Sequence, residues 1–210
     1  RRIGFDLVHH LTFGVFRTPG WMWCLGAPFA LGPVGGAEFT PRPLTKSFNR
    51  SAKLIEFMRK AANYIALLDP SLWGALSRAR WVYTCTHETR RFLPKRFHSK
   101  IDIEPIIGAD SPKPIGPAPD YQRGSLELLF VGRLIHWKGL DFALKAVALA
   151  REIHPKIRLT ILGKGREQEH LQGLAADLNI QSQLTWINWI EEDDLNALYA
   201  RSHAVVFPSL

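Results

Sequence analysis

The stretch Leu128-Leu-Phe-Val-Gly-Arg-Leu-Ile-His-Trp-Lys-Gly-Leu-Asp141 decides the fold of the second half of the chain. Its first four residues, 128–131, are apolar and predict a short buried strand that the following glycine ends. Two cations, Arg133 and Lys138, come next, and an amphipathic helix opens near Gly139. Because the first N–H groups of a helix lack intrahelical partners, this turn suits a diphosphate. On spacing alone, two solvated surface charges explain the cations equally well.

Strand and helix patterns alternate after this stretch, with short connections between them. The first predicted helix covers about 139–153, and the later elements are strand 158–162, helix 166–178, strand 184–188, helix 192–201 and strand 204–207. Such alternation is typical of a parallel sheet covered by helices, whose ligands bind beyond the carboxyl ends of the strands. The residues at those predicted ends are Arg133, Gly163, Lys164, Gly165, Trp189 and Ile190.

The string Gly-Arg-Leu-x-x-x-Lys-Gly at 132–139 resembles the start of the C-terminal domain in family 4 glycosyltransferases (glycosyl transferases group 1). These enzymes have the GT-B fold. The resemblance implies that Arg133 and Lys138 are catalytic and clamp the diphosphate of a nucleotide-sugar donor, with Gly132 beside it. It implies no resident cofactor and no metal, because the two cations neutralise the diphosphate charge.

The same resemblance supplies further donor contacts. Gly163-x-Gly165 corresponds to a glycine pair that lines the donor cleft, although such a pair alone is more often a plain strand-to-helix turn. Ile190, in the loop after the next strand, would lie near the nucleotide base.

The first half of the chain also resembles this family. Residues 5–11 and 27–31 predict strands, and a glycine-rich loop follows the second. Similar "HH-T-F" and "PF-GPVGG-E" strings occur in one branch of the family. Gly35 and Gly36 would form a loop facing the cleft, or a simple tight turn. His10 is the candidate for a catalytic cleft histidine, and the alternative is an ordinary hydrogen-bonded histidine.

The predicted fold class is therefore α/β and GT-B-like, with two Rossmann-like parallel-sheet domains that are both incomplete. Residues 108–125 predict a linker, because their repeated prolines cannot lie within a sheet or a helix. Residues 1–107 would form the later part of an acceptor-side domain, and residues 126–210 the first part of the donor domain. Residues 205–210 resemble the segment that leads into the family's Glu-x7-Glu motif, so we interpret the chain as a fragment, inactive by itself.

Charge is unevenly divided between these halves. Residues 1–125 hold 18 Lys and Arg against 9 Asp and Glu, whereas residues 126–210 hold 9 against 10. A basic amphipathic helix is predicted at about 48–68, with apolar side chains at positions 54, 57, 58, 61, 65 and 68. A basic domain suits an acidic partner, and we expect peripheral contact with an anionic membrane surface. A solvated face without a partner is the alternative.

Several classes are disfavoured by composition. No stretch predicts a continuous spanning helix. Cys24 and Cys85 lie in apolar runs without metal-ligand spacing, which predicts buried thiols in a cytoplasmic protein. Trp21, Trp23 and Trp73 also lie in apolar runs rather than among cations, which argues against a nucleic-acid-binding module.

The resemblance implies a retaining transferase that moves a sugar from a nucleotide diphosphate sugar to an acceptor hydroxyl on a glycan, lipid or lipid carrier. It would serve cell-envelope polysaccharide synthesis, in the cytoplasm or at the inner face of the membrane. Another GT-B enzyme, such as a sugar-nucleotide epimerase or a phosphorylase, is the main alternative because it would share a phosphate site.

Overall fold

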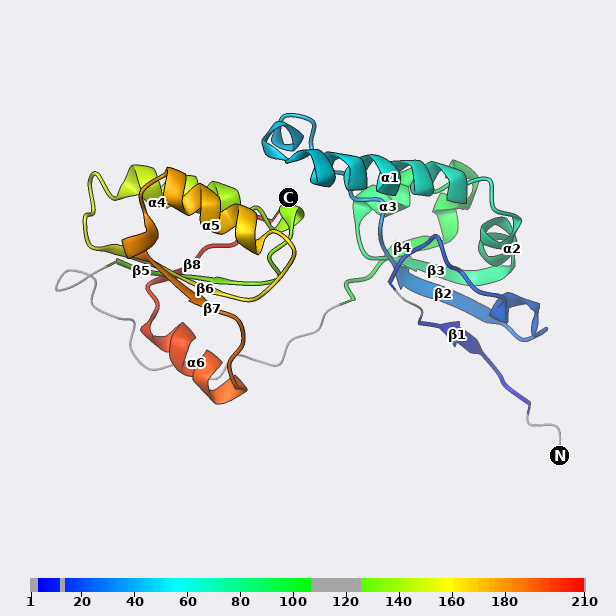
Figure 1. Cartoon of the computed structure of the whole chain (residues 1–210). Coiled ribbons are helices and arrows are strands. Elements are labelled where there is room, and N and C mark those ends of the chain that lie inside the picture. Colours follow the sequence, from blue (N-terminus) through cyan, green and yellow to red (C-terminus); the bar gives the residue numbers. More distant parts are fainter. Residues whose placement is uncertain (1–3, 12–13, 107–125, 210) are drawn as a thin grey trace. The chain divides into compact units, whose positions relative to one another are not determined.

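The structure is a computed structural model that describes residues 4–11, 14–106 and 126–209. The chain divides into two compact units, Arg1–Ser111 and Pro112–Leu210. Each unit contains a parallel four-stranded sheet with helices packed on it, as Figure 1 shows. The predicted α/β class is therefore confirmed. The predicted linker, 108–125, lies outside the described residues.

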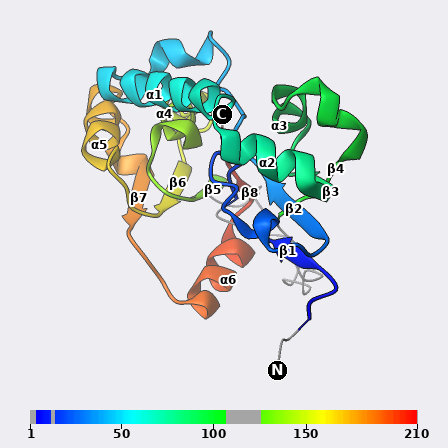
Figure 2. The ribbon, with the colours of Figure 1, turned by 90° about the vertical axis from the view of Figure 1, so that its right-hand side faces the viewer.

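The sheet of the first unit has the order β1-β2-β3-β4, and every neighbouring pair is parallel. Its strands are β1 (Val8–His10), β2 (Phe29–Val34), β3 (Ala79–Thr84) and β4 (Ile101–Ile103). Three helices lie on one side of this sheet in Figures 1 and 2, namely α1 (Arg50–Ala66), α2 (Pro70–Arg78) and α3 (His87–Phe92).

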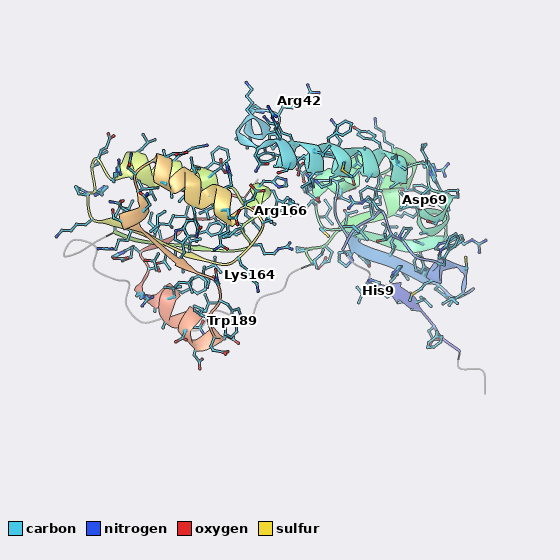
Figure 3. The ribbon with its side chains drawn as sticks, in the orientation of Figure 1. His9, Arg42, Asp69, Lys164, Arg166 and Trp189 are labelled. Carbon is cyan, nitrogen blue, oxygen red and sulfur yellow. The ribbon has the colours of Figure 1, made fainter. Side chains whose placement is uncertain are left out.

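All three helices of this unit begin at a residue whose side chain accepts a hydrogen bond from the first turn. Asn49 accepts from the N–H of Ala52 at 2.8 Å, and Asp69, labelled in Figure 3, accepts from Ser71 at 2.8 Å. Thr86 accepts from Thr89 at 3.2 Å. These bonds satisfy donors that the helices leave without partners, which fixes where each helix starts.

The core of the first unit lies between the sheet and the helices. Its fully buried side chains come mainly from β2, β3 and α2, and include Phe29, Leu31, Val34, Leu72, Leu76 and Val82. The helix α1 adds only Ala52, Asn63 and Ala66 to the buried residues. The long predicted helix is therefore present, but it packs through small side chains.

The sheet of the second unit has the order β7-β6-β5-β8, again with parallel pairs. Its strands are β5 (Leu126–Val131), β6 (Ile157–Leu162), β7 (Leu184–Ile187) and β8 (Ala204–Val205). The chain moves outward from β5 to β7 and then returns to place β8 on the other side of β5. The direction of strand order therefore reverses at β5.

Helices cover both faces of this second sheet, as Figure 1 shows. Phe130 and Ile161 pack into the larger cluster, which includes residues of α4 and α5, whereas their strand neighbours Leu129 and Leu162 pack against Leu198 of α6. Because both faces of the central strand β5 are covered, its residues 128–131 form a continuous apolar run. The strand β6 instead alternates between apolar and polar residues up to Thr160. The helices are α4 (Leu140–Ala150), α5 (Gln168–Asp177) and α6 (Glu192–Arg201).

Every element predicted for the second unit is present, with ends that differ by at most three residues. One difference affects the site: a 3-10 turn, η5 (His136–Lys138), precedes α4, so Lys138 ends that turn. None of the described helices is long and apolar enough to cross a membrane.

Candidate functional site

The loop that follows β5 lies where the strand order of the second sheet reverses. Ligands of open α/β sheets bind beyond the carboxyl ends of the strands at such a switch point, because the two flanking connections leave in opposite directions. Two segments border this point, the loop 132–139 after β5 and the segment 206–209 after β8. The predicted cations Arg133 and Lys138 both belong to the first of these segments.

The two cations are held differently. The side chain of Arg133 is exposed, and no hydrogen bond or ion pair joins its guanidinium to any residue that the structure describes. Lys138 is half-buried, and its Nζ lies 4.7 Å from the centre of the Phe207 ring, which follows β8. This cation–π contact links the two segments of the switch point. Arg133 is thus free to meet an anion, and Lys138 is held beside it along the loop.

The loop after β5 also packs tightly against the segment after β8. Gly139 has a φ of +65°, and a Cβ at this position would collide with the carbonyl oxygen of Pro208. The hydroxyl of Ser209 donates a hydrogen bond to the carbonyl of Trp137 at 3.3 Å. Gly139, the last residue of the Gly-Arg-Leu-x-x-x-Lys-Gly string, is therefore required by backbone packing.

Gly163 and Gly165 bring the loop after β6 against the loop after β5. Gly163 has a φ of +144°, and a Cβ there would collide with the carbonyl oxygen of Gly132. A Cβ at Gly165 would collide with the carbonyl oxygen of Leu134. The N–H of Leu134 in turn donates to the carbonyl of Lys164 at 3.1 Å. This geometry supports a positioning role, since the glycines hold the Arg133 loop in place.

The loop after β6 adds two cations that surround the same edge. Lys164 and Arg166 are both exposed, and Figure 3 shows them near the end of β6. An Arg166 Nη lies 3.1 Å from Nδ1 of buried His136, and its guanidinium lies 5.8 Å from the ring centre of Trp137. Sequence reasoning missed Arg166, although its position directly after the Gly-x-Gly pair was a usable signal.

The N-terminus of α4 favours an anion less than its position suggested. Asp141 lies in the first turn and pairs with Lys145 at 3.2 Å. A carboxylate in the first turn offsets the positive end of the helix dipole. Positive charge at this edge of the sheet therefore comes from the side-chain cations of the two loops rather than from the helix N-terminus.

The loop after β7 presents its backbone and one exposed aromatic ring at the carboxyl edge of the second sheet. The half-buried side chain of Ile190 packs against the cluster of Leu129 and Leu198 under α6, which leaves its backbone as the more accessible part. The neighbouring Trp189 is 68% exposed, and Figure 3 shows its side chain beside α6.

In the first unit, the backbone groups of Gly35 and Gly36 are already satisfied within the protein. The N–H of Gly35 donates to the carbonyl of Gly14 at 2.8 Å, and its carbonyl accepts from Phe16 at 3.0 Å. Gly36, whose φ is +103°, donates its N–H to a carboxylate and accepts from the side chain of Asn63 at 2.8 Å. The loop is thus held rigidly, and these groups are not free donors for a ligand.

The carboxylate that holds Gly36 belongs to Glu38. Its Oε2 accepts from Gly36 N–H at 2.8 Å, and its Oε1 accepts from the hydroxyls of Thr86 at 2.6 Å and Thr89 at 2.7 Å. Burial by itself raises the pKa of this carboxyl, but these hydrogen bonds outweigh it and the net pKa is lowered. Glu38 therefore stays ionised and joins β2's loop to α3. Sequence reasoning missed this residue.

His10 is half-buried and packs against neighbours in the first unit. A Cβ on Gly20 would lie 2.6 Å from Cε1 of His10, and the imidazole centre lies 6.4 Å from that of the Phe29 ring. The preceding His9, labelled in Figure 3, places its Nε2 2.7 Å from the carbonyl oxygen of Gly32. These contacts favour a packing role for His10 over the predicted catalytic role.

Comparison with known proteins places the second unit in a family. Residues 120–210 match the model of the family "Glycosyl transferases group 1". This part of the chain belongs to the group 1 glycosyltransferases. Glycogen synthase of Mycobacterium tuberculosis is 36% identical over 86 residues, which cover 41% of this chain and 21% of that protein. D-inositol 3-phosphate glycosyltransferase of Pseudarthrobacter chlorophenolicus is 37% identical over 90 residues, with the same coverage. The matched region spans about a fifth of these curated relatives.

Solved glycosyltransferase structures show the fold over both units. HepE of Anabaena, crystallised with UDP and glucose, superposes with a TM-score of 0.59 at 14% identity, covering 98% of this chain and 53% of that chain. The lipopolysaccharide outer core galactosyltransferase WaaB gives a TM-score of 0.52 at 14% identity, covering 97% of this chain and 73% of that chain. The predicted GT-B fold is confirmed.

The prediction that both cysteines are buried is wrong, and one argument against a nucleic-acid partner does not hold. Cys24 is exposed, in a 3-10 turn η1 (Met22–Cys24) that has no buried residue, and Cys85 is only half-buried. The tryptophans also meet cations in space: Arg96 lies 4.1 Å from the ring centre of Trp73. Arg78 similarly lies 5.8 Å from that of Trp23. The expectation that nucleic acid is not a partner loses this support and stays a prediction.

Proposed function

We propose that the second unit binds a nucleotide diphosphate sugar at the switch point of its sheet. The complete protein then transfers the sugar, with retention of its anomeric configuration, to the hydroxyl of a glycan, a lipid or a lipid carrier. The observation that carries this proposal is the position of Arg133 and Lys138 in the loop after β5. It is supported by the family match, by relatives named as sugar transferases and by UDP in the HepE structure.

The proposed chemistry follows from charge. Cleavage of the donor builds negative charge on the leaving diphosphate, so a fixed cation near it stabilises the transition state more than the ground state. Arg133 offers a guanidinium that pairs with none of the described residues, and Lys138 offers an ammonium held by Phe207. Lys164 and Arg166 add positive potential at the same edge.

The remaining residues act through shape. Gly132, Gly163 and Gly165 allow the two loops to pack closely, which fixes the Arg133 loop. The backbone at Ile190 meets the nucleotide base. The first unit takes the acceptor, with the held Gly35–Gly36 loop forming part of its surface.

Turnover of the full-length enzyme tests this assignment. Replacing Arg133 or Lys138 by Ala should lower kcat by about two orders of magnitude or more, the usual effect of removing a transition-state donor. Lys156→Ala is the matched control, because Lys156 is exposed and directly precedes β6, at the opposite edge of the sheet. Near-normal turnover of both site variants would contradict the proposal. Donor turned over without any acceptor, to an epimer or with phosphate, would favour the epimerase or phosphorylase alternative.

A further inference from the structure

A positive charge lies against the loop after β2 in the first unit. The guanidinium of Arg17 is half-buried, and its Nη1 donates a hydrogen bond to the side-chain carbonyl of Asn63. Asn63, on α1, is fully buried, and its amide also donates to the carbonyl of Gly36 at 2.8 Å. A Cβ at Gly36 would lie 3.7 Å from Nη1 of Arg17. Arg17 therefore contacts the same loop whose backbone groups are already satisfied within the protein.

The guanidinium of Arg17 forms no ion pair with any carboxylate that the structure describes. Its hydrogen-bond partner is the neutral amide of Asn63. The carboxylate of Glu38, in the same loop, binds the N–H of Gly36 and two threonine hydroxyls instead. Burial, and next the charge of Arg59, lower the pKa of Arg17. Both effects disfavour the charged form, so the protein keeps a cation here against the preference of its surroundings.

The helix α1 brings two further cations to this loop. Arg59 pairs through Nη2 with Glu56 at 2.8 Å, but its Nε is buried and has no hydrogen-bond acceptor in the described part of the chain. Its guanidinium lies 6.0 Å from the ring centre of Phe39, which directly follows Glu38. The Nζ of Lys60 lies at the same distance, 6.0 Å, from that ring centre. Two guanidiniums and one ammonium therefore flank the loop after β2.

A structural role alone does not explain a charge at position 17. Partial removal of a cation from water without a counterion destabilises a fold, and a neutral glutamine would also offer Asn63 an N–H donor. Departures of this kind are expected at functional sites, where a ligand supplies the missing charge. Two neighbouring guanidiniums suit a phosphate monoester, because each planar fork binds two oxygens and the ester carries a charge of about −1.5 to −2 at pH 7.

We propose that Arg17, together with Arg59, binds a phosphate group carried by the acceptor substrate. This inference rests on the proposed function, in which the first unit takes the acceptor. Asn63 is a positioning residue for this site, because it holds the guanidinium of Arg17 and the carbonyl of Gly36 at the same time. The acceptor class is thereby narrowed from any compound with a hydroxyl to one that also bears a phosphate.

NMR titration of the chain with inorganic phosphate tests the site. Phosphate replaces chloride at constant ionic strength, so that general screening of charges stays the same. The backbone amide of Gly36 and the side-chain amide of Asn63 should shift in a saturable way, because both groups lie next to Arg17. The amide of Gly173, in α5 of the second unit, should not shift. The absence of a saturable shift at both Gly36 and Asn63 would overturn the proposal.

Substitution of Arg17 tests the cation itself. Arg17→Gln keeps a donor for Asn63 without the charge, and should lower phosphate affinity by about tenfold or more, the loss expected for a charge-assisted hydrogen bond. Arg17→Lys keeps the charge without the planar fork, so its affinity should lie between those of the parent and Arg17→Gln. Arg91→Gln removes a charge from an exposed position on α3 and should leave the affinity unchanged. Equal affinity in the parent and in Arg17→Gln would overturn the proposal.

Urea unfolding separates ligand binding from a structural role. Without phosphate, Arg17→Gln should be at least as stable as the parent, because it removes a half-buried charge and its repulsion from Arg59. Saturating phosphate should stabilise the parent more than Arg17→Gln, because a ligand stabilises the folded state in proportion to its affinity. A destabilised Arg17→Gln that phosphate stabilises as much as it does the parent would make Arg17 a structural residue and overturn the proposal.

Two ligands identify the substrate that carries the phosphate. Glucose 6-phosphate, a sugar phosphate monoester, should shift the signals of Gly36 and Asn63, whereas glucose at the same concentration should not. UDP should shift Gly132 and Gly163 in the second unit and leave Gly36 unchanged. A shift of Gly36 with UDP but not with glucose 6-phosphate would assign the phosphate to the donor and overturn the acceptor assignment. UDP binding in the second unit without any phosphate response at Gly36 would overturn this inference and leave the proposed donor site standing.

Discussion

The two units use the same parallel-sheet architecture but treat the polar groups at their loops differently. In the first unit, the polar groups of the loop after β2 form hydrogen bonds within the protein. Both the N–H and the carbonyl of Gly36 are hydrogen-bonded, and Glu38 accepts three hydrogen bonds. In the second unit, the loop after β5 leaves Arg133 exposed and without a described partner. A polar group that the fold leaves unpaired at a strand end is the better marker of a ligand site.

The helices of the two units also differ in the size of the side chains that they bury. The helix α4 turns its large residue Leu144 into the core, where it is fully buried. The helix α1 turns Ala52 inward and Leu54 outward. Hydrophobic periodicity therefore shows which residues share a face, but a helix with small residues opposite a large apolar stripe can pack through either side.

Among the substitutions in the loops, the largest stability effect is expected where backbone meets backbone. Gly163→Ala places a Cβ against the carbonyl of Gly132 at a φ of +144°, which we expect to cost on the order of 3 kcal/mol in free energy of unfolding. Gly36→Ala, at φ +103°, meets only side chains, those of Val15 at 3.2 Å and Arg17 at 3.7 Å, and should cost roughly 1–2 kcal/mol. Urea unfolding of each variant measures the difference.

Gly173→Ala is the control for these glycine substitutions. Gly173 lies within α5 and a Cβ there would meet nothing within 4 Å. Alanine should stabilise this helix position by roughly 0.5–1 kcal/mol. A Gly163→Ala variant as stable as the parent would show that the two loops are not packed as described.

Glu38→Ala should have the next largest effect. It leaves the N–H of Gly36 and two threonine hydroxyls without their acceptor, at a cost of roughly 2 kcal/mol. Glu38→Gln should cost less, because the hydroxyls of Thr86 and Thr89 can accept from the amide. The exposed Glu104 offers a matched control, and Glu104→Gln should change the free energy of unfolding by under about 0.5 kcal/mol.

The effect of Glu38 should depend on pH. Hydrogen bonds lower its folded pKa below the unfolded value, so its contribution is complete above the unfolded pKa and is lost as pH falls through the folded pKa. The stability gap between the parent and Glu38→Ala should therefore be larger at about pH 7 than at about pH 3. A gap that widens on acidification would contradict the hydrogen-bonded carboxylate.

The smallest effect is expected on the exposed face of α1. Leu54→Ser and Met58→Ser should each change the free energy of unfolding by under about 0.5 kcal/mol, because neither side chain is buried. Leu72→Ala, in the core of the same unit, should cost roughly 2–5 kcal/mol. A serine at position 54 that destabilised as strongly as Leu72→Ala would show that the stripe is buried within the chain.

Much of the second unit could be predicted from sequence, because its strands are short apolar-rich segments that alternate with helices having an apolar side. The first unit was harder. The strand β4 has three residues, too few for a pattern, and α2 was missed although Asp69-Pro70 is a helix-start signal.

The site was predictable only in part, for a physical reason. Arg133 and Lys138 follow a strand in the sequence, and local pattern marks that position. The contacts of Lys138 with Phe207, of Arg166 with His136, and of Glu38 with α3 join residues far apart in the chain. The local pattern of a single sequence does not show which distant residues will meet in the fold. The roles of the site residues stay predictions.

Calorimetric titration of UDP and GDP into the chain tests the central claim most directly, with Arg133→Ala and Lys156→Ala titrated in parallel. We predict saturable binding of one nucleotide, weakened by about tenfold or more in Arg133→Ala, because a charge-assisted bond to the diphosphate is lost, and unchanged in Lys156→Ala. Nucleotide binding that is equally strong in the parent and in Arg133→Ala would contradict a donor site at the switch point of the second sheet.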